Sequence, residues 1–199
     1  MSATIIDPKQ FCRDLGIPRE EADFIDLKSE FDPKRRPVFY LPAVQMTHKT
    51  KATAWPLMVK ALDKRLDKHK SRQVLVHTVS TDLAQYVYKN SSHQSRMIVY
   101  GNGVRREDAL RAFTESKTPR VLVAQSMDRG VDLFDDLCRV ILVLKVPYLN
   151  LGDKQIAKRV YGSKDGNRWY HVQAWRTLVQ MTGRNMRHDQ DWGITEILD

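Results

Sequence analysis

The segment RVILVLKV, residues 139–146, is the most hydrophobic part of the sequence and decides which fold class the chain can adopt. Its purely apolar part, Val140 to Leu144, ends at Lys145, far short of the roughly 18 apolar residues that a membrane-spanning helix needs. A short run of β-branched and leucine side chains is typical of a strand buried in a parallel sheet. We therefore expect a buried strand in a soluble protein that has no membrane partner.

In the rest of the sequence, short apolar runs alternate with segments whose apolar residues have helical spacing. The other strands that we expect are Val38 to Leu41, QVLVHTV (73–79), RMIVY (96–100), RVLVAQ (120–125) and ITEIL (194–198). The helices that we expect are a short one capped by Asp7 and closed by Gly16, Ala52 to Lys70, TDLAQYVYKN (81–90), EDALRAFTES (107–116) and a long one near Tyr170 to His188. This alternation predicts an α/β fold with a mostly parallel central sheet covered by helices, which binds ligands at the carboxyl ends of its strands.

Length and composition favour one intracellular domain with an anionic partner. The 199 residues are 42% hydrophobic, and we find no linker, so we treat residues 1–70 as a lead-in and 71–199 as the core of a single domain. The net charge of +9 favours a polyanion, although many basic proteins merely carry solvated lysines. Cys12 and Cys138 are far apart, and the start MSATIIDPKQ has no secretory signal, so we expect a protein that is not secreted.

The segment LVQMTGRNMRHDQDWG, residues 178–193, concentrates side chains that can bind an anion. If Leu178 to Arg187 is helical, Gln180, Arg184 and Arg187 fall at i, i+4 and i+7 on one stripe. Guanidinium groups suit phosphate, and Gly183 would allow a close approach, but a solvated helix face is the simpler alternative. Since the sequence contains no G-x-x-x-x-G-K-[ST] loop, these arginines would have to complete a nucleotide site on another domain.

Five ordered segments resemble motifs of superfamily 2 helicases of the XPD/DinG-like family. QMTGRNMRHDQDWG (180–193) resembles motif VI, SMDRGVDL (126–133) resembles motif V, and VLVHTVS (74–80) resembles motif IV. RVILVLKVPYLN (139–150) resembles the strand and Val-Pro-Tyr turn after motif V, and Ser2-Ala3-Thr4 resembles motif III. The resemblance covers nearly the whole chain. It implies a RecA-like three-layer fold and the second motor domain of a longer helicase, with a remnant of motif III at its start.

The resemblance also implies roles for individual residues. Arg187 would be an arginine finger at the γ-phosphate of ATP, with Arg184 and Gln180 beside it. Residues implied to bind nucleotide or couple it to DNA are Gly130, Asp132, Gly183, Ser2 and Thr4, and residues implied to contact single-stranded DNA are Thr78, Ser80 and Ser126. ATP and Mg²⁺ would be held mainly by the first motor domain, which would also carry any iron–sulfur cluster. No metal site is expected in this chain, and alone it should not hydrolyse ATP.

Structural alternatives exist for several of these residues and for the chain as a whole. Ser80 opens a helix, so N-capping explains it as well as phosphate binding does, while Asp191 and Gly193 fit a turn into the last strand. His77 fits a core position, and we expect the same of Trp169, Tyr170 and Trp175. The rival function is a stand-alone basic module that binds nucleic acid without motor activity, and a third is a degenerate domain kept for protein contacts.

Overall fold

The computed structural model describes residues 4–47, 49–100, 103–125 and 131–199, and the chain divides into two compact units. The sheet unit comprises Phe31–Val146 and Thr182–Asp199. The helical unit comprises Met1–Glu30 and Pro147–Met181. This division places the whole β-sheet in one unit.

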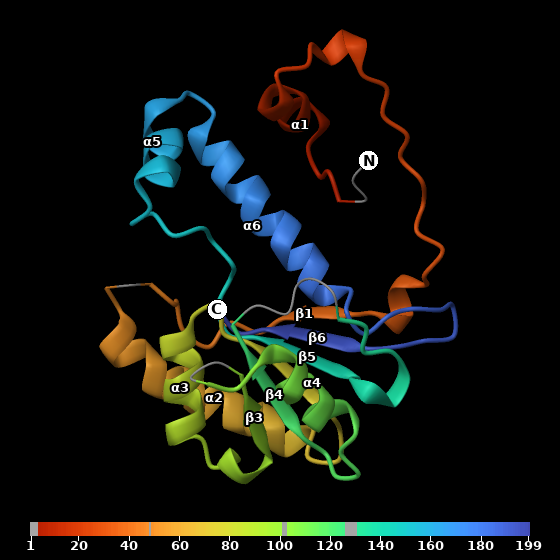
Figure 1. Ribbon diagram of the computed structural model, residues 1–199, viewed down its shortest axis with the longest axis vertical. Coiled ribbons are helices and arrows are strands. Elements are labelled where there is room, and N and C mark those ends of the chain that lie inside the picture. The colour runs from red at the N-terminus through yellow and green to blue at the C-terminus, as the bar shows by residue number, and fades with distance from the viewer. Residues whose placement is uncertain (1–3, 48, 101–102, 126–130) are drawn as a thin grey trace. The chain divides into compact units, whose positions relative to one another are not determined.

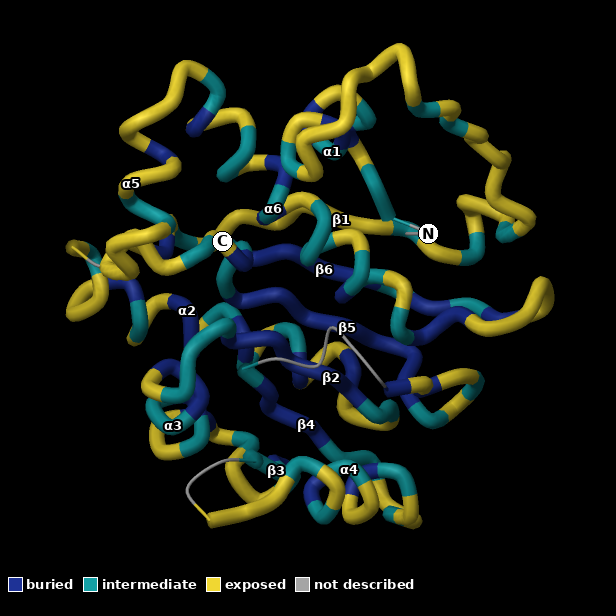
Figure 2. The backbone as a smooth tube through the Cα atoms, turned by 45° about the horizontal axis from the view of Figure 1, so that its top comes forward, coloured by how far each residue is buried: buried dark blue, intermediate teal, exposed yellow. Residues whose placement is uncertain are grey.

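The sheet unit is built on parallel strands in the order β1-β6-β5-β2-β4-β3 (Figure 1). The strands are β1 Val38–Tyr40, β2 Val74–His77, β3 Met97–Val99, β4 Val121–Ala124, β5 Val140–Val143 and β6 Ile194–Ile197. Every residue of β2, β4 and β5 is buried, which explains their almost unbroken apolar sequences (Figure 2). The predicted α/β fold and each predicted strand are confirmed.

The helices of the sheet unit cover the sheet and form its core. They are α2 Lys51–Lys68, α3 Thr81–Asn90 and α4 Arg106–Thr114, with the 3-10 turns η2 Pro33–Arg35, η3 Gln94–Arg96 and η4 Asp135–Leu137. Val74 and Val76, which share one face of β2, belong to the same buried cluster as Met58 and Leu62 of α2 and Leu83 of α3. Each such buried side chain contributes roughly 1.5–3 kcal/mol, so α2 and α3 hold this face of the sheet.

The helical unit contains α1 Pro8–Leu15, η1 Arg19–Glu21, α5 Lys154–Gly162 and most of α6 Gly166–Thr182. The predicted ends of α1 are confirmed, because Asp7 accepts the Gln10 N–H at 3.0 Å and Gly16 adopts a left-handed φ of 69°. α5 was not predicted, although Asp153 caps it by accepting two backbone N–H groups. In the described part of the chain, no helix combines the length and apolar character needed to cross a membrane.

The aromatic residues at the start of α6 follow the core prediction only in part. Trp169 is half-buried against the guanidinium of Arg159, whose carbon lies 4.4 Å from the ring centroid. Tyr170 is half-buried, and its hydroxyl donates to the Leu149 carbonyl at 2.8 Å. Trp175, in contrast, is 54% exposed, so its predicted place in the core was wrong.

Candidate functional site

Residues 183–193, which we name the arginine loop, connect α6 to β6. The prediction of one helix from Leu178 to Arg187 was wrong, because α6 ends at Thr182 and the arginine loop is made of turns and extended residues. Arg184 and Arg187 therefore do not share a helical stripe with Gln180.

The helix stops because its backbone groups are bonded elsewhere after Gly183. In a continuing helix, the Arg184 carbonyl would accept a hydrogen bond from the residue four positions later, and the Arg187 N–H would donate to Gly183. Instead, the Arg184 carbonyl accepts the Leu133 N–H at 3.1 Å, and the Arg187 N–H donates to Asp191 Oδ2 at 3.1 Å. These two bonds define the loop.

Arg184 ties the arginine loop to the segment that resembles motif V. Its side chain is half-buried, and Nη1 donates to the Val131 carbonyl at 3.4 Å. Together with the backbone bond to Leu133, this places Arg184 against residues 131–133 by both its main chain and its side chain. The geometry suits a connecting role between the two motifs.

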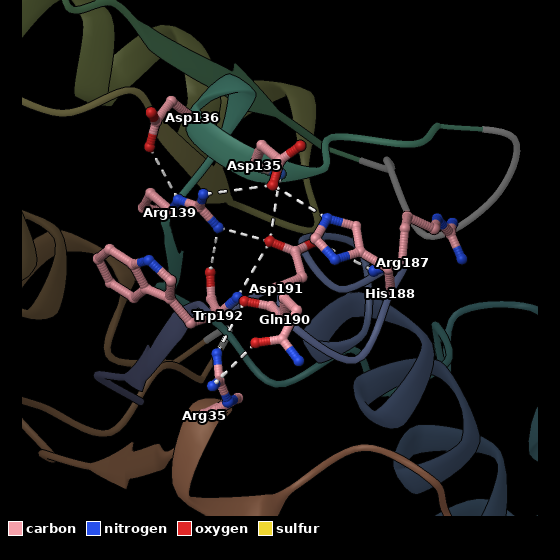
Figure 3. Close-up of polar contacts among 9 residues, drawn as sticks. All are labelled: Arg35, Asp135, Asp136, Arg139, Arg187, His188, Gln190, Asp191 and Trp192. Carbon is pink, nitrogen blue, oxygen red and sulfur yellow. Dashed lines mark hydrogen bonds and ion pairs between the residues drawn. The ribbon is translucent and has the colours of Figure 1, made fainter.

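Arg187 reaches the surface beside the same segment. Its guanidinium forms an ion pair with Asp132, and the two side chains are 38% and 61% exposed. Figure 3 shows the Arg187 side chain directed away from the polar contacts around Asp191. Because exposed ion pairs are worth only about 0–1 kcal/mol, an incoming anion could replace Asp132 at little cost.

Asp191 holds the arginine loop from inside. Its side chain is fully buried, and its carboxylate accepts hydrogen bonds from Arg139 Nη1 at 2.5 Å and from three backbone N–H groups. These N–H groups belong to Arg187 at 3.1 Å, Asp135 at 3.2 Å and Trp192 at 3.0 Å. A buried carboxylate with this many partners fixes the backbone, so the prediction that Asp191 shapes the turn is confirmed.

Gly193 is required beside Asp191 because there is no room for a side chain. A Cβ atom at Gly193 would lie 1.9 Å from Nδ2 and 2.5 Å from Cγ of Asn185, whose side chain is buried. The Gly193 N–H donates to the Arg35 carbonyl at 2.9 Å, which joins the loop to the residues before β1. The structure thus gives Gly193 a close-packing role, and the turn role expected from the sequence stays a prediction.

Arg139 supports this arrangement, and our sequence reasoning missed it. It directly precedes β5, and its guanidinium also donates to Asp136 at 2.9 Å and to the Trp192 carbonyl at 2.8 Å (Figure 3). Burial alone would lower the pKa of Arg139, but the bonds to Asp136 and Asp191 outweigh it, so the pKa is raised and the group stays charged. The cluster therefore lies at the amino ends of β5 and β6, not at the carboxyl ends that open α/β sheets led us to inspect.

A group of metal-ligand types lies within this cluster. Ligand atoms of Asp135, His188 and Asp191 lie within 4.8 Å of one another, and His188 Nε2 is 3.0 Å from Asp135 Oδ1. Both oxygens of Asp191 already accept hydrogen bonds, and Arg139 brings a positive charge to one of them. This set of groups is better suited to holding the loop than to binding a cation.

The predicted DNA contacts require one correction. Thr78 is fully buried, and its hydroxyl lies within hydrogen-bonding distance of the carbonyls of Ser80 at 3.1 Å and Ala124 at 3.3 Å, so its predicted contact with DNA was wrong. Ser80 is half-buried and caps α3 by accepting the Leu83 N–H at 3.2 Å. Capping of α3 is thus confirmed, and phosphate binding by Ser80 stays a prediction. His77 is fully buried, as expected.

Among the remaining predicted residues, Gln180 and Thr4 lie outside the arginine loop and Gly183 is its first residue. Gln180 is half-buried near the end of α6, and Thr4 precedes α1, both in the helical unit. Gly183 is exposed in the turn after α6. The residues that lie outside the described part of the chain are Ser2, Ser126 and Gly130.

Comparison with protein families and curated proteins gives consistent matches. Residues 64–199 match the model of the helicase C-terminal domain family. A Fanconi anemia group J protein homolog of Gallus gallus is 33% identical over 104 residues, which cover 46% of this chain and 8% of that protein. The ATP-dependent DNA helicase DinG of Photobacterium profundum is 25% identical over 204 residues, which cover 95% of this chain and 29% of that protein. The chain thus spans only a minor part of these relatives.

Solved structures resemble the fold. The structure of S. tokodaii Xpd4 has a TM-score of 0.62 at 21% identity, covering 81% of this chain and 33% of that chain. S. cerevisiae Dbp5 bound to RNA and ADP BeF3 has a TM-score of 0.58 at 12% identity, covering 96% of this chain and 41% of that chain. At these identities the likeness concerns the fold alone, which is the RecA-like arrangement that was expected.

Proposed function

The chain belongs to the helicase C-terminal domain family and is the C-terminal domain of an XPD/DinG-like superfamily 2 helicase, and from this premise we propose that it completes an ATP site on another motor domain. In the parent protein, the two domains would hydrolyse ATP and move along single-stranded DNA. The relative DinG is named an ATP-dependent DNA helicase, which supports this reading. We expect the parent protein to act on DNA inside the cell.

The role of arginine finger is proposed for Arg187. The observation that carries this assignment is the contrast between its anchored backbone and its accessible side chain. The N–H group of Arg187 is bonded to the buried carboxylate of Asp191, while its guanidinium is 38% exposed and is paired with an exposed acid. A catalytic arginine needs a fixed backbone position and a side chain that can reach a phosphate.

A coupling role is proposed for Arg184 and Asp132. Arg184 is bonded to the Val131 carbonyl and, through its own carbonyl, to Leu133, so movement of the arginine loop would carry residues 131–133 with it. Asp132, within that segment, would release Arg187 when a phosphate group competes for the guanidinium. This arrangement would transmit the state of the nucleotide to the segment that resembles motif V.

The arginine loop is the main part of this chain that would take part in the chemistry of ATP and Mg²⁺. Both groups would be held mainly by the first motor domain, and hydrolysis supplies the free energy for movement. The Arg187 guanidinium suits a γ-phosphate because its planar fork can donate two parallel hydrogen bonds. Gln180 and Thr4 are proposed as further nucleotide contacts, and Ser80 as a contact with the DNA backbone.

The decisive experiment compares wild type and Arg187→Ala in the parent protein, by single-turnover ATP hydrolysis with single-stranded DNA present. We expect a loss of about 10³- to 10⁵-fold in rate, with nucleotide binding largely retained. Arg35→Ala is a matched control, because Arg35 donates to the Gln190 carbonyl on the same loop at 2.8 Å without being a candidate finger. A loss of less than about tenfold for Arg187→Ala would contradict the proposal.

A second measurement, on the 199-residue chain, distinguishes a motor domain from the rival function, a stand-alone binding module. A motor domain should show no ATPase activity alone. ATPase activity should appear when a domain that carries the phosphate loop is added. A stand-alone binding module should bind single-stranded DNA tightly and in a salt-sensitive way, with no such complementation.

A further inference from the structure

A groove of about 810 Å³ lies within the helical unit, between the residues that open α1 and the amino-terminal half of α6. Basic side chains line it, namely Lys9, Arg19 and Arg168, together with the rings of His171 and Trp175. None of these residues belongs to the motifs on which the proposed function rests. A groove lined by cations and exposed rings suits a ligand that carries both anionic groups and planar rings.

The rings form a connected, solvent-accessible row. His171 and Trp175 lie one turn apart on α6, with ring centroids separated by 6.4 Å and planes inclined by 36°. Tyr148 continues the row, with its centroid 5.6 Å from that of His171. Trp175 is 54% exposed and Tyr148 is 38% exposed, so both rings are accessible to solvent.

The charge of the groove is positive after internal pairing is counted. Arg168 lies on the same side of α6 as His171 and Trp175, at i, i+3 and i+7. Its Nε lies 2.6 Å from Asp7 Oδ2, yet its side chain stays 63% exposed. Because this pair contributes little net charge, the net positive charge of the groove comes from Lys9 and Arg19, which are both exposed.

We propose that this groove binds single-stranded DNA, with a base stacked on Trp175 and neighbouring phosphates held by Lys9 and Arg168. Stacking on an aromatic ring tolerates any base, and the basic side chains follow the backbone, which is the combination that single-strand binding uses. The inference deepens the proposed function, on which it rests for the identity of the polymer. It adds a DNA contact that lies outside the helicase motifs.

The test measures binding of the 199-residue chain, without ATP, to two probes of equal length. One is an oligothymidylate of about 12 nucleotides, within the range of known single-strand sites, and the other is the same backbone without bases. Trp175→Ala should weaken binding of the oligothymidylate roughly 5- to 100-fold and leave binding of the abasic probe unchanged. Trp175→Phe should keep most of the affinity. Tyr161→Ala is the control, because Tyr161 is exposed on α5 but does not line the groove.

The basic side chains have their own test with the same probes. Lys9→Gln should weaken both probes by the same factor and reduce the slope of log affinity against log salt by about 0.7, as expected for one phosphate contact on a single strand. Lys158→Gln, on the exposed side of α5, is the control and should change neither quantity.

Each other outcome is decisive in a different way. If the wild type binds the oligothymidylate but Trp175→Ala does not weaken it, the groove is not the site, and the proposed motor function is unaffected. If the wild type binds neither probe, the DNA part of the proposed function fails as well. If Trp175→Ala impairs only ATPase complementation by the first motor domain, the groove is a contact between domains and the proposal is overturned.

Discussion

The guanidinium of Arg139 lies 2.5 Å from the fully buried carboxylate of Asp191, and this ion pair joins the start of β5 to the arginine loop. The same carboxylate accepts the backbone N–H of Arg187. The position of the candidate finger therefore depends on an arginine that lies 48 residues earlier in the chain, directly before β5.

Arg139→Met should lower the free energy of unfolding by about 3–5 kcal/mol, because it leaves the charge of Asp191 buried without its partner. The double variant Arg139→Met with Asp191→Asn removes that charge and should recover part of the loss. Urea unfolding of the wild type, both single variants and the double variant gives the coupling energy directly. A loss of less than about 1 kcal/mol for Arg139→Met would show that the pair does not hold the loop.

Gly193→Ala should destabilise the sheet unit by about 1–3 kcal/mol, because the new Cβ would overlap the buried Asn185 side chain. Asn185→Ala in the same chain removes the overlapping atoms and should restore part of the stability. Thermal unfolding of the four proteins in this cycle tests the steric explanation. If Asn185→Ala gives no rescue, the glycine is needed for another reason.

Glu196 should make the free energy of unfolding depend on pH in the acid range. It is buried on β6 between Arg65 and His69. Burial alone would raise the pKa of Glu196, but the bonds from His69 and Arg65 outweigh it and lower the pKa from 4.5 to about 2. Because the folded-state pKa is the lower one, the stabilisation is complete above pH 4.5 and is lost as the pH falls towards 2. The expected loss is about 3 kcal/mol.

Glu196→Gln should remove most of this pH dependence, whatever it does to stability at neutral pH. Urea unfolding at several pH values between about 2 and 7 measures the slope. Asp108→Asn is the matched control, since Asp108 is paired with Arg105 at the surface, where solvent screens the pair. An equal slope in wild type and Glu196→Gln would assign the acid sensitivity to other carboxylates.

Sequence patterns predicted the fold well because its signals are local. Runs such as RVILVLKV are typical of buried strands, and Asp7 and Gly16 mark the two ends of α1 through their hydrogen bond and backbone conformation. α5 was missed because few of its residues are buried, and only Val160 is among those assigned to the core. The local signals for this helix, a capping Asp153 and apolar residues at helical spacing at Ile156 and Val160, were present but span only nine residues.

Only those residues of the candidate site that belong to a motif could be predicted from the sequence. Arg184, Arg187 and Asp132 could be listed from the sequence, but the helical spacing that seemed to align the arginines was broken by bonds to Leu133 and Asp191. The bond to Leu133 joins residues that are far apart in the sequence, so a local sequence pattern cannot reveal it. For the same reason Arg139 could not be recognised as a partner of Asp191.

Ser80→Asp should separate the two roles considered for this residue. Aspartate caps a helix as well as serine does, so the free energy of unfolding should change by less than about 0.5 kcal/mol. If Ser80 also contacts a DNA phosphate, the added negative charge should weaken binding of single-stranded DNA several-fold. Ser80→Ala, in contrast, should lower the free energy of unfolding by about 1 kcal/mol, because the helix cap is lost. Unchanged DNA binding in Ser80→Asp would restrict Ser80 to capping.

Arg184 and Arg187 should differ in what they contribute to the folded chain. Arg187→Ala removes only an exposed ion pair with Asp132, so the free energy of unfolding should fall by no more than about 1 kcal/mol. Arg184→Ala removes a bond to the carbonyl of Val131, a buried residue, and should cost about 1–2 kcal/mol. Urea unfolding of the 199-residue chain measures both losses. A large loss for Arg187→Ala would mean that its guanidinium is a structural group, and that any fall in ATPase activity reflects a disturbed loop and not a missing finger.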